Sequence, residues 1–318
     1  MTIDVGSQLK FVRDTTRIIG DDSTLRRAAV QGSVIRVRPG VYIDTATWEA
    51  LDRDARYLAR IHAVARTRRA NTPLVSHLSS AALHRLPIAG AWPAEVHLTC
   101  KRSMTGRRVS GVTRHATGYE GTYPEVIDGV TVTGLARTLV DVAATEPFVR
   151  SVPMLDHALR LGWVTVEELL MSVEQRSPFR GARRVRLAIE FADAAAESVA
   201  ESVSRVNFSR IGAPRPVLQR AWRHPDGRTF RTDFHFEAYD TIGEVDGRGK
   251  YKRAEMLHGR TPEDVLWEEK QREDWLRMRA RAFLRWDWSV AMSPEDLRRR
   301  LAGVGIPTGL SSPLRGLA

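Results

Sequence analysis

The chain has 318 residues, 42% of them hydrophobic and 27% charged, with a formal net charge of +11. This length suits two or three domains, and the composition is that of globular protein rather than of a disordered chain. The single cysteine, Cys100, excludes an internal disulfide and a cysteine-based zinc site. Without an apolar run of membrane-spanning length or a signal peptide, we expect a cytoplasmic protein, no membrane partner, and DNA as the polyanion that the charge favours.

Residues 7–43 have the pattern of two helices followed by a hairpin. A first helix is expected between Gln8 and Ile19, and a second from a cap at Ser23 to a left-handed residue at Gly32. The runs on either side of Pro39-Gly40 predict a tight hairpin.

Helix, turn, helix and hairpin is the order of a winged helix-turn-helix domain, which we expect over residues 1–50. The second helix would enter the major groove, and the hairpin would add phosphate contacts. The alternative is a helix pair and hairpin that serve packing alone. The expected DNA-binding residues of this domain are Arg26, Arg27, Arg36 and Arg38.

The middle of the chain predicts a helix over residues 52–70 and several short strands over residues 94–133. His77 and His84 lie near a helix, and without a third ligand nearby we interpret them as core residues that form hydrogen bonds. A basic loop lies between two strands and suits phosphate contact, although a solvated loop is an equal alternative. Its expected DNA-binding residues are Lys101, Arg102, Arg107 and Arg108.

Four further helices are predicted over residues 135–143, 148–161, 166–174 and 181–192. Asp141 and Asp156 fall within these helices, and we interpret both as caps or surface partners. Arginines from Arg176 to Arg186 precede a domain boundary expected at residues 176–195. They would draw DNA inward or form a solvated helix face.

Three segments resemble the amino-terminal domain of AbiEi-family antitoxins of type IV toxin–antitoxin systems. They are residues 33–42 (SVIRVRPGVY), 76–86 (SHLSSAALHRL) and 130–141 (VTVTGLARTLVD), and the likeness spans roughly residues 5–175. The resemblance implies DNA binding and transcriptional autoregulation, with an α+β middle domain at residues 51–180. It also implies a nucleotidyltransferase-like toxin encoded nearby, as a genetic partner.

Two strands are predicted in residues 229–246. Hydrophobic and polar residues alternate from Phe230 to Phe236, and residues 241–246 place Glu244 and Asp246 on one face. A short turn between these strands would bring Asp233 beside both acids. Because clustered carboxylates repel one another, a divalent cation is expected to compensate their charge.

This arrangement resembles the very-short-patch-repair-like branch of the PD-(D/E)XK nucleases, over about residues 193–290. Asp233 matches the family's aspartate, Glu244 its second acid, and Glu201 the glutamate of the preceding Ser-x-x-Glu helix. Asp246 stands where the general pattern has lysine, and the branch often has Glu-x-Asp-Gly there. The candidates for the basic catalytic residue are Lys250, Lys252 and Lys270, the last on a helix that begins at Thr261 and also carries Arg272.

The resemblance implies a restriction-endonuclease-like α/β/α domain over residues 181–300 that hydrolyses DNA with Mg²⁺ or Mn²⁺. The metal would lie on Asp233, Glu244 and the Val245 carbonyl, with Glu201 orienting a water and Lys250 or Lys252 steadying the phosphate. The alternative to a metal site is that these acidic residues lie on the solvent face of a hairpin. Glu201 would then pair with Arg205, one helical turn further along.

The expected fold class is therefore α+β and multidomain: a winged helix-turn-helix, a mixed α/β middle region and an endonuclease-like domain, followed by a loose tail at residues 301–318. The expected function is cleavage or nicking of DNA in a defence or toxin–antitoxin context. The alternative is an antitoxin and transcriptional autorepressor whose nuclease fold is inactive.

Overall fold

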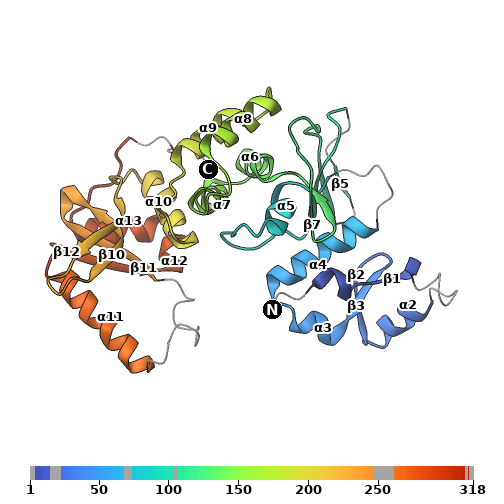
Figure 1. Ribbon diagram of the computed structural model, residues 1–318, viewed down its shortest axis with the longest axis horizontal. Helices are drawn as coiled ribbons and strands as arrows, with labels where there is room; N and C mark the ends of the chain where they lie inside the picture. The colour runs from blue at the N-terminus through green and yellow to red at the C-terminus, as the bar shows by residue number, and fades with distance from the viewer. Residues whose placement is uncertain are drawn as a thin grey trace. The chain divides into compact units, whose positions relative to one another are not determined.

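The computed structural model describes residues 4–14, 23–67, 74–103, 107–109, 111–246, 261–311 and 314. The chain packs as two compact units, the first formed by residues 1–146 with 164–186 and the second by residues 147–163 with 187–318. Both contain helices and strands, so the fold is mixed α+β (Figure 1). Among the described residues, no helix is long and apolar enough to span a lipid bilayer.

The first unit opens with a three-stranded sheet of order β1-β3-β2. Helix α2 (Ser23–Val30) precedes the predicted hairpin of β2 (Val34–Arg38) and β3 (Val41–Asp44). Gly32 and Gly40 adopt φ values of 79° and 78°, which glycine tolerates best, so the predicted helix end and hairpin turn are confirmed.

The helix predicted to start at Gln8 is wrong at its beginning. A 3₁₀ turn, η1 (Val5–Gln8), leads into strand β1 (Lys10–Phe11), and helical backbone starts only at Val12. The cause is tertiary packing: Phe11 pairs with Val41 of β3 and is 2% exposed in the core of this sheet. Residues 15–22, the rest of the predicted helix, lie outside the described residues.

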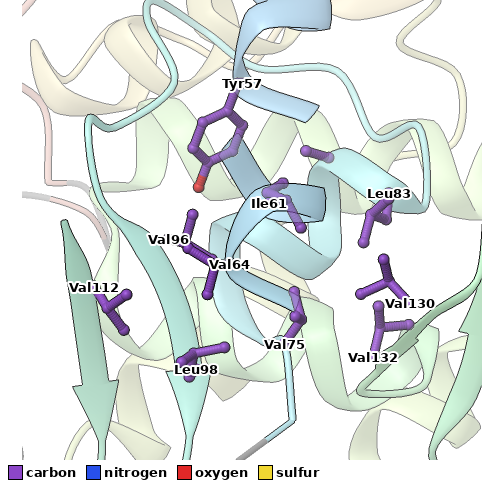
Figure 2. Close-up of a cluster of buried hydrophobic side chains, with 11 residues drawn as sticks. Tyr57, Ile61, Val64, Val75, Leu83, Val96, Leu98, Val112, Val130 and Val132 are labelled. Atoms are coloured by element: carbon purple, nitrogen blue, oxygen red, sulfur yellow. The ribbon is translucent and has the colours of Figure 1, made fainter. Parts of the chain in front are cut away.

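The rest of the first unit surrounds a core built from helix and sheet. Figure 2 shows Ile61 and Val64 of α4 beside Leu83 of α5, Val96 of β4 and Val130 of β8. The predicted strands and helices of this region are present. The elements are α3 (Thr45–Ala50), α4 (Arg53–Arg66), α5 (His77–Leu83), β4 (Val96–Thr99), β5 (Arg107–Val109), β6 (Val112–His115), β7 (Glu125–Ile127), β8 (Val130–Val132), α6 (Leu135–Thr145) and α8 (Val166–Arg176), with α9 (Ala182–Phe191) at the border of the two units.

Asp141, predicted as a cap or surface partner, is instead completely buried. It accepts a hydrogen bond from Arg137 at 2.9 Å and lies 3.1 Å from a guanidinium nitrogen of Arg176. Burial raises the pKa of Asp141 despite these two charges. Arg176 is itself 4% exposed, so it is not part of a solvent-facing basic segment that could attract DNA.

The second unit is organised around a four-stranded sheet of order β12-β11-β10-β9. Strand β10 runs antiparallel to both β9 and β11, and β12 runs parallel to β11 after the helix α11. Phe208 of α10 packs against Phe234 and Trp286 on one face, while Trp275 of α11 packs against Ile242 on the other. The elements are α7 (Phe148–Arg160), α10 (Val199–Arg210), β9 (Val217–Arg223), β10 (Thr229–Phe236), η2 (Glu237–Tyr239), β11 (Thr241–Asp246), α11 (Pro262–Arg277), β12 (Ala282–Asp287), α12 (Trp288–Ala291) and α13 (Pro294–Gly303).

The tail predicted to be loose is packed in its described part. Helix α13 extends to Gly303, and Ile306 is 1% exposed. Backbone hydrogen bonds then join Gly309 to Ile211 at 2.7 Å and Leu310 to Gly212 at 2.9 Å. The glycine- and proline-containing sequence did not predict these contacts, because they join backbone groups of segments far apart in the chain.

Candidate functional site

Asp233 and Glu244 lie on neighbouring strands. Asp233 and Glu244 are the next residues beyond the last pair of the β10–β11 register, Phe234 with Gly243, and are therefore neighbours across the two strands. Opposite residues of an antiparallel pair share a face, here the face that α11 covers. Asp233 Oδ2 accepts a hydrogen bond from the Val245 backbone N–H at 2.9 Å, which anchors the carboxylate across the strands.

Glu244 is held by two arginines. Its Oε1 lies 2.5 Å from Arg272 of α11, and its Oε2 lies 2.8 Å from Arg285 of β12, the residue in register with it. Burial alone would lower the pKa of each arginine, but the hydrogen bonds and charge of Glu244 outweigh this and raise both. The sequence predicts that a divalent cation compensates the negative charge of the clustered carboxylates. In the structure, two guanidinium groups compensate the charge of Glu244.

Further carboxylates surround the same two arginines. Glu269 lies 3.0 Å from Arg272, Glu273 lies 2.8 Å from Arg285, and Asp246 lies 3.6 Å from Arg285. With Asp233 and Glu244, five carboxylates thus accompany two guanidinium groups. We call these seven residues the acidic cluster: Asp233, Glu244, Asp246, Glu269, Arg272, Glu273 and Arg285. It carries an excess of negative charge in a basic protein.

The residues present fit a magnesium ion with mostly water ligands. No group of three or more histidine, cysteine or acidic residues has a metal-binding arrangement within the described ranges. Mg²⁺, however, usually keeps several waters and needs one or two protein carboxylates. Asp233 and Glu244 would supply these two if Glu244 left its arginines, and the Val245 carbonyl is the third ligand that the resemblance implies.

Glu201 holds the start of α10 in place. The helix is capped by Ser198, and the Glu201 carboxylate accepts hydrogen bonds from the Glu197 N–H at 2.9 Å and from Gln219 at 3.0 Å. Glu201 is 4% exposed, and burial raises its pKa. Its hydrogen bonds go to these neighbours rather than to Asp233 or Glu244.

The alternative pairing of Glu201 with Arg205 is wrong. Arg205 instead donates to Asp156 at 2.8 Å, and both side chains are buried. Burial raises the pKa of Asp156 to about 6, so this aspartate too is a core residue and not the surface partner that the sequence predicted.

The three candidate lysines have different outcomes. Lys270 is exposed on α11, with its Nζ 5.8 Å from the centre of the Trp267 ring. Arg272 is the basic residue of this helix that enters the acidic cluster. Lys250 and Lys252 lie outside the described residues, as does Gly247.

The residues predicted to bind DNA lie in the first unit. Arg26, Arg27 and Arg36 are exposed, whereas Arg38 is half-buried. Lys101 and Arg102 are also exposed, and Arg102 donates to the Arg176 carbonyl at 2.8 Å. Arg107 and Arg108 fall on β5, with side chains that the structure does not describe.

The first unit contains a histidine cluster that was not predicted from the sequence. His77 stacks on His115 with ring centres 3.6 Å apart, and His115 Nε2 lies 3.2 Å from Nδ1 of His97. A ring nitrogen binds a metal in the plane of its ring, so the stacked rings of His77 and His115 cannot point at one ion. His84 instead contacts the Thr133 carbonyl at 2.9 Å. No sequence pattern links His97 and His115, which lie on different strands, β4 and β6.

Comparison with known proteins gives two matches and no family. No family model matches the chain. Residues amounting to 42% of the chain are 31% identical to two uncharacterized proteins of Mycobacterium tuberculosis, Rv2248 of strain H37Rv and MT2308 of strain CDC 1551. The chain spans about half the length of these curated relatives, with 50% of each covered.

Proposed function

We propose that this protein binds DNA through its first unit and hydrolyses phosphodiester bonds of DNA in its second, with Mg²⁺ or Mn²⁺ as cofactor. The proposal is carried by the placement of Asp233 and Glu244 opposite one another on β10 and β11. Glu201 lies on the preceding helix, and α10 and α11 pack on opposite faces of the sheet. This order supports the endonuclease-like α/β/α fold that the resemblance to PD-(D/E)XK nucleases implies.

The chemistry divides between the ion and the chain. When bound by Asp233, Glu244 and the Val245 carbonyl, the ion supplies charge stabilisation at the phosphate and a more acidic water. Release of Glu244 removes one carboxylate partner from each of Arg272 and Arg285, and guanidinium groups bind phosphate oxygens in pairs. Asp233 stays oriented by the Val245 N–H. Lys250 or Lys252 steadies the phosphate in this proposal. The resemblance assigns the orientation of the attacking water to Glu201, whose hydrogen bonds in the structure hold the start of α10, a helix on the face of the sheet opposite the acidic cluster.

DNA binding in the first unit is supported by a helix and a basic hairpin in sequence order. Exposed arginines lie on both α2 and β2. This suits a winged helix-turn-helix, as the resemblance to AbiEi-family antitoxins also implies. We accordingly place the protein in the cytoplasm, in a defence or toxin–antitoxin context, with a nucleotidyltransferase-like toxin encoded nearby.

A second candidate function is DNA binding and transcriptional autorepression without cleavage. The observation that favours it is the direct pairing of Glu244 with Arg272 and Arg285, which neutralises a carboxylate that the nuclease needs for its metal. In this alternative the acidic cluster is an ion-pair network that stabilises the sheet against α11.

Incubation of supercoiled plasmid with the full-length protein separates the two functions. We expect nicked or linear product with Mg²⁺ or Mn²⁺ and none with EDTA. Asp233→Asn and Glu244→Gln should each reduce the rate at least about 100-fold, the scale of losing one electrostatic group in a catalytic site. Glu237→Gln is the matched control, because Glu237 is exposed in the 3₁₀ turn η2 between β10 and β11 and pairs at the surface, 3.1 Å from Arg220.

Full cleavage by Asp233→Asn would refute the nuclease proposal. A wild-type protein that shifts promoter DNA in a gel and leaves it intact in Mg²⁺ would support the autorepressor instead. Retained DNA binding by Asp233→Asn checks that the substitution has not unfolded the protein.

A further inference from the structure

A cavity of about 360 Å³ lies in the first unit between the β2–β3 hairpin, helix α4 and strand β4. The hairpin contributes Arg38, α4 contributes Arg60 and Val64, and β4 contributes Val96. Val64 and Val96 also belong to the core shown in Figure 2. None of the described residues that line it is an aspartate or glutamate.

The guanidinium group of Arg38 is partly buried at this cavity without a counter-charge. Its Nε and one terminal nitrogen are inaccessible to solvent and have no hydrogen-bond partner in the described structure. Burial lowers the pKa of Arg38, which is the mark of a charge removed from water without compensation. By contrast, the buried arginines Arg137 and Arg205 each form an ion pair with an aspartate.

Local backbone geometry places Arg38 at this position. The pairing of β2 with β3 shifts between Arg36, opposite Tyr42, and Arg38, opposite Val41. One extra residue on a strand re-aims the side chains that follow it, and such bulges are frequent beside binding sites. Arg36, before the shift, is exposed and does not line the cavity.

Two charges and apolar walls define the ligand. Arg60 is half-buried, and its guanidinium carbon lies 5.9 Å from the centre of the Trp48 ring. Two arginines suit a dianion, and a phosphate group carries about −1.5 to −2 charges at neutral pH whereas a carboxylate carries one. The remaining walls are mainly apolar, as in pockets that enclose the organic part of a small ligand.

We propose that this cavity binds a phosphate monoester of about mononucleotide size. Its phosphate lies on Arg38 and Arg60, and its organic part lies against Val64 and Val96. The ligand is either a free nucleotide or the phosphorylated end of a nucleic acid strand. The inference goes beyond the proposed function, because it requires neither the acidic cluster nor binding of duplex DNA.

Calorimetric titration of the full-length protein with thymidine 5′-monophosphate tests the site. We expect Arg38→Gln and Arg60→Gln each to weaken binding at least about tenfold, as expected for loss of a charged hydrogen-bonding group. Arg53→Gln is the matched control on α4, because Arg53 is exposed, donates to the Gly90 carbonyl at 2.7 Å and does not line the cavity, and it should leave the affinity unchanged. Thymidine, which lacks the phosphate, should bind at least about tenfold more weakly than the monophosphate.

A second measurement separates a ligand site from a structural arginine. Without ligand, Arg38→Gln should leave the melting temperature unchanged or raise it by roughly 2 °C, because an uncompensated buried charge is removed. A fall of several degrees would assign Arg38 to structure and overturn the proposal. Equal binding of the monophosphate by wild-type protein and Arg38→Gln would also overturn it.

Single-stranded oligonucleotides with and without a 5′-phosphate then distinguish the two sources of the ligand. A preference for the phosphorylated oligonucleotide that Arg38→Gln abolishes identifies a strand end. Binding of the free monophosphate with no such preference identifies a free nucleotide. Absence of both effects overturns the proposal.

Discussion

Three histidines far apart in the sequence lie together in the core of the first unit. His77 is fully buried, and its ring packs against that of His115. Burial first, and then the neighbouring His97 and Arg176, lower the pKa of His115 to about 3. Burial first, and then His115 and other neighbouring charged groups, lower the pKa of His77. His77 and His115 therefore remain neutral in the folded protein at neutral pH.

Acid should destabilise the first unit through His115. Unfolded His115 gains its proton near pH 6.5, whereas the folded protein resists protonation down to about pH 3. Stability is therefore fully present above pH 6.5 and is lost as the pH falls toward 3, by up to about 1.4 kcal/mol per pH unit. Urea unfolding at a series of pH values should give a shallower acid slope for His115→Gln than for the wild type. Parallel slopes would contradict the folded-state protonation assigned here.

Single residues show where sequence patterns reach their limit. Asp141 has the appearance of an ordinary helix residue, because its partner Arg176 lies 35 positions further along the chain. For Glu201 the sequence pattern is ambiguous, since Ser-x-x-Glu is typical both of the nuclease branch and of a helix cap. The hydrogen bonds of Glu201 serve the cap, and a catalytic role stays a prediction.

Among the elements, strand β11 tolerates little change, because Glu244 on one of its faces belongs to the acidic cluster and Val245 on the other packs in the core. Gly243 precedes Glu244, and a Cβ atom built on it would lie 2.7 Å from the Trp286 ring. That ring cannot easily move, since it stacks on Phe234 and its Nε1 donates to Ser204 at 3.0 Å. A side chain at residue 243 would therefore force the sheet and the Trp286 ring apart.

Gly243→Ala should destabilise the second unit by about 2 kcal/mol, the usual scale of overpacking a buried site. Gly303→Ala is the control, because nothing lies within 4 Å of its added Cβ and the residue is helical. The control should be neutral or slightly stabilising. Urea unfolding followed by tryptophan fluorescence measures both variants. Equal midpoints for the two would show that Trp286 can yield.

At the element scale the sequence predicts most of the second unit but not its pairings. Alternation over residues 229–246 gave both strands and set Asp233 near Glu244, because a short turn fixes an antiparallel register locally. The position of Arg285 opposite Glu244 depends on the crossover through α11 to a parallel strand. No local pattern encodes that register, so the neutralisation of Glu244 was not predictable.

For the whole molecule, the question is where a net charge of +11 acts. Some arginines are committed to internal partners, as Arg137 and Arg205 are, and the acidic cluster is locally negative. A general positive charge is therefore an insufficient account of the proposed DNA binding. Under this proposal, exposed arginines of the first unit carry a larger share of the binding than composition alone suggests.

The salt dependence of DNA binding tests this directly. Each phosphate contact contributes about −0.9 to the slope of log K against log salt concentration. Arg26→Gln combined with Arg36→Gln should make the slope shallower by about 2, in EDTA to exclude cleavage. Arg298→Gln combined with Arg299→Gln removes the same charge from the surface of α13, where both arginines pair with acids of their own helix, and should leave the slope unchanged. Identical slopes for the two double variants would mean that DNA is attracted by net charge alone, and the winged-helix assignment of α2 and β2 would then fail.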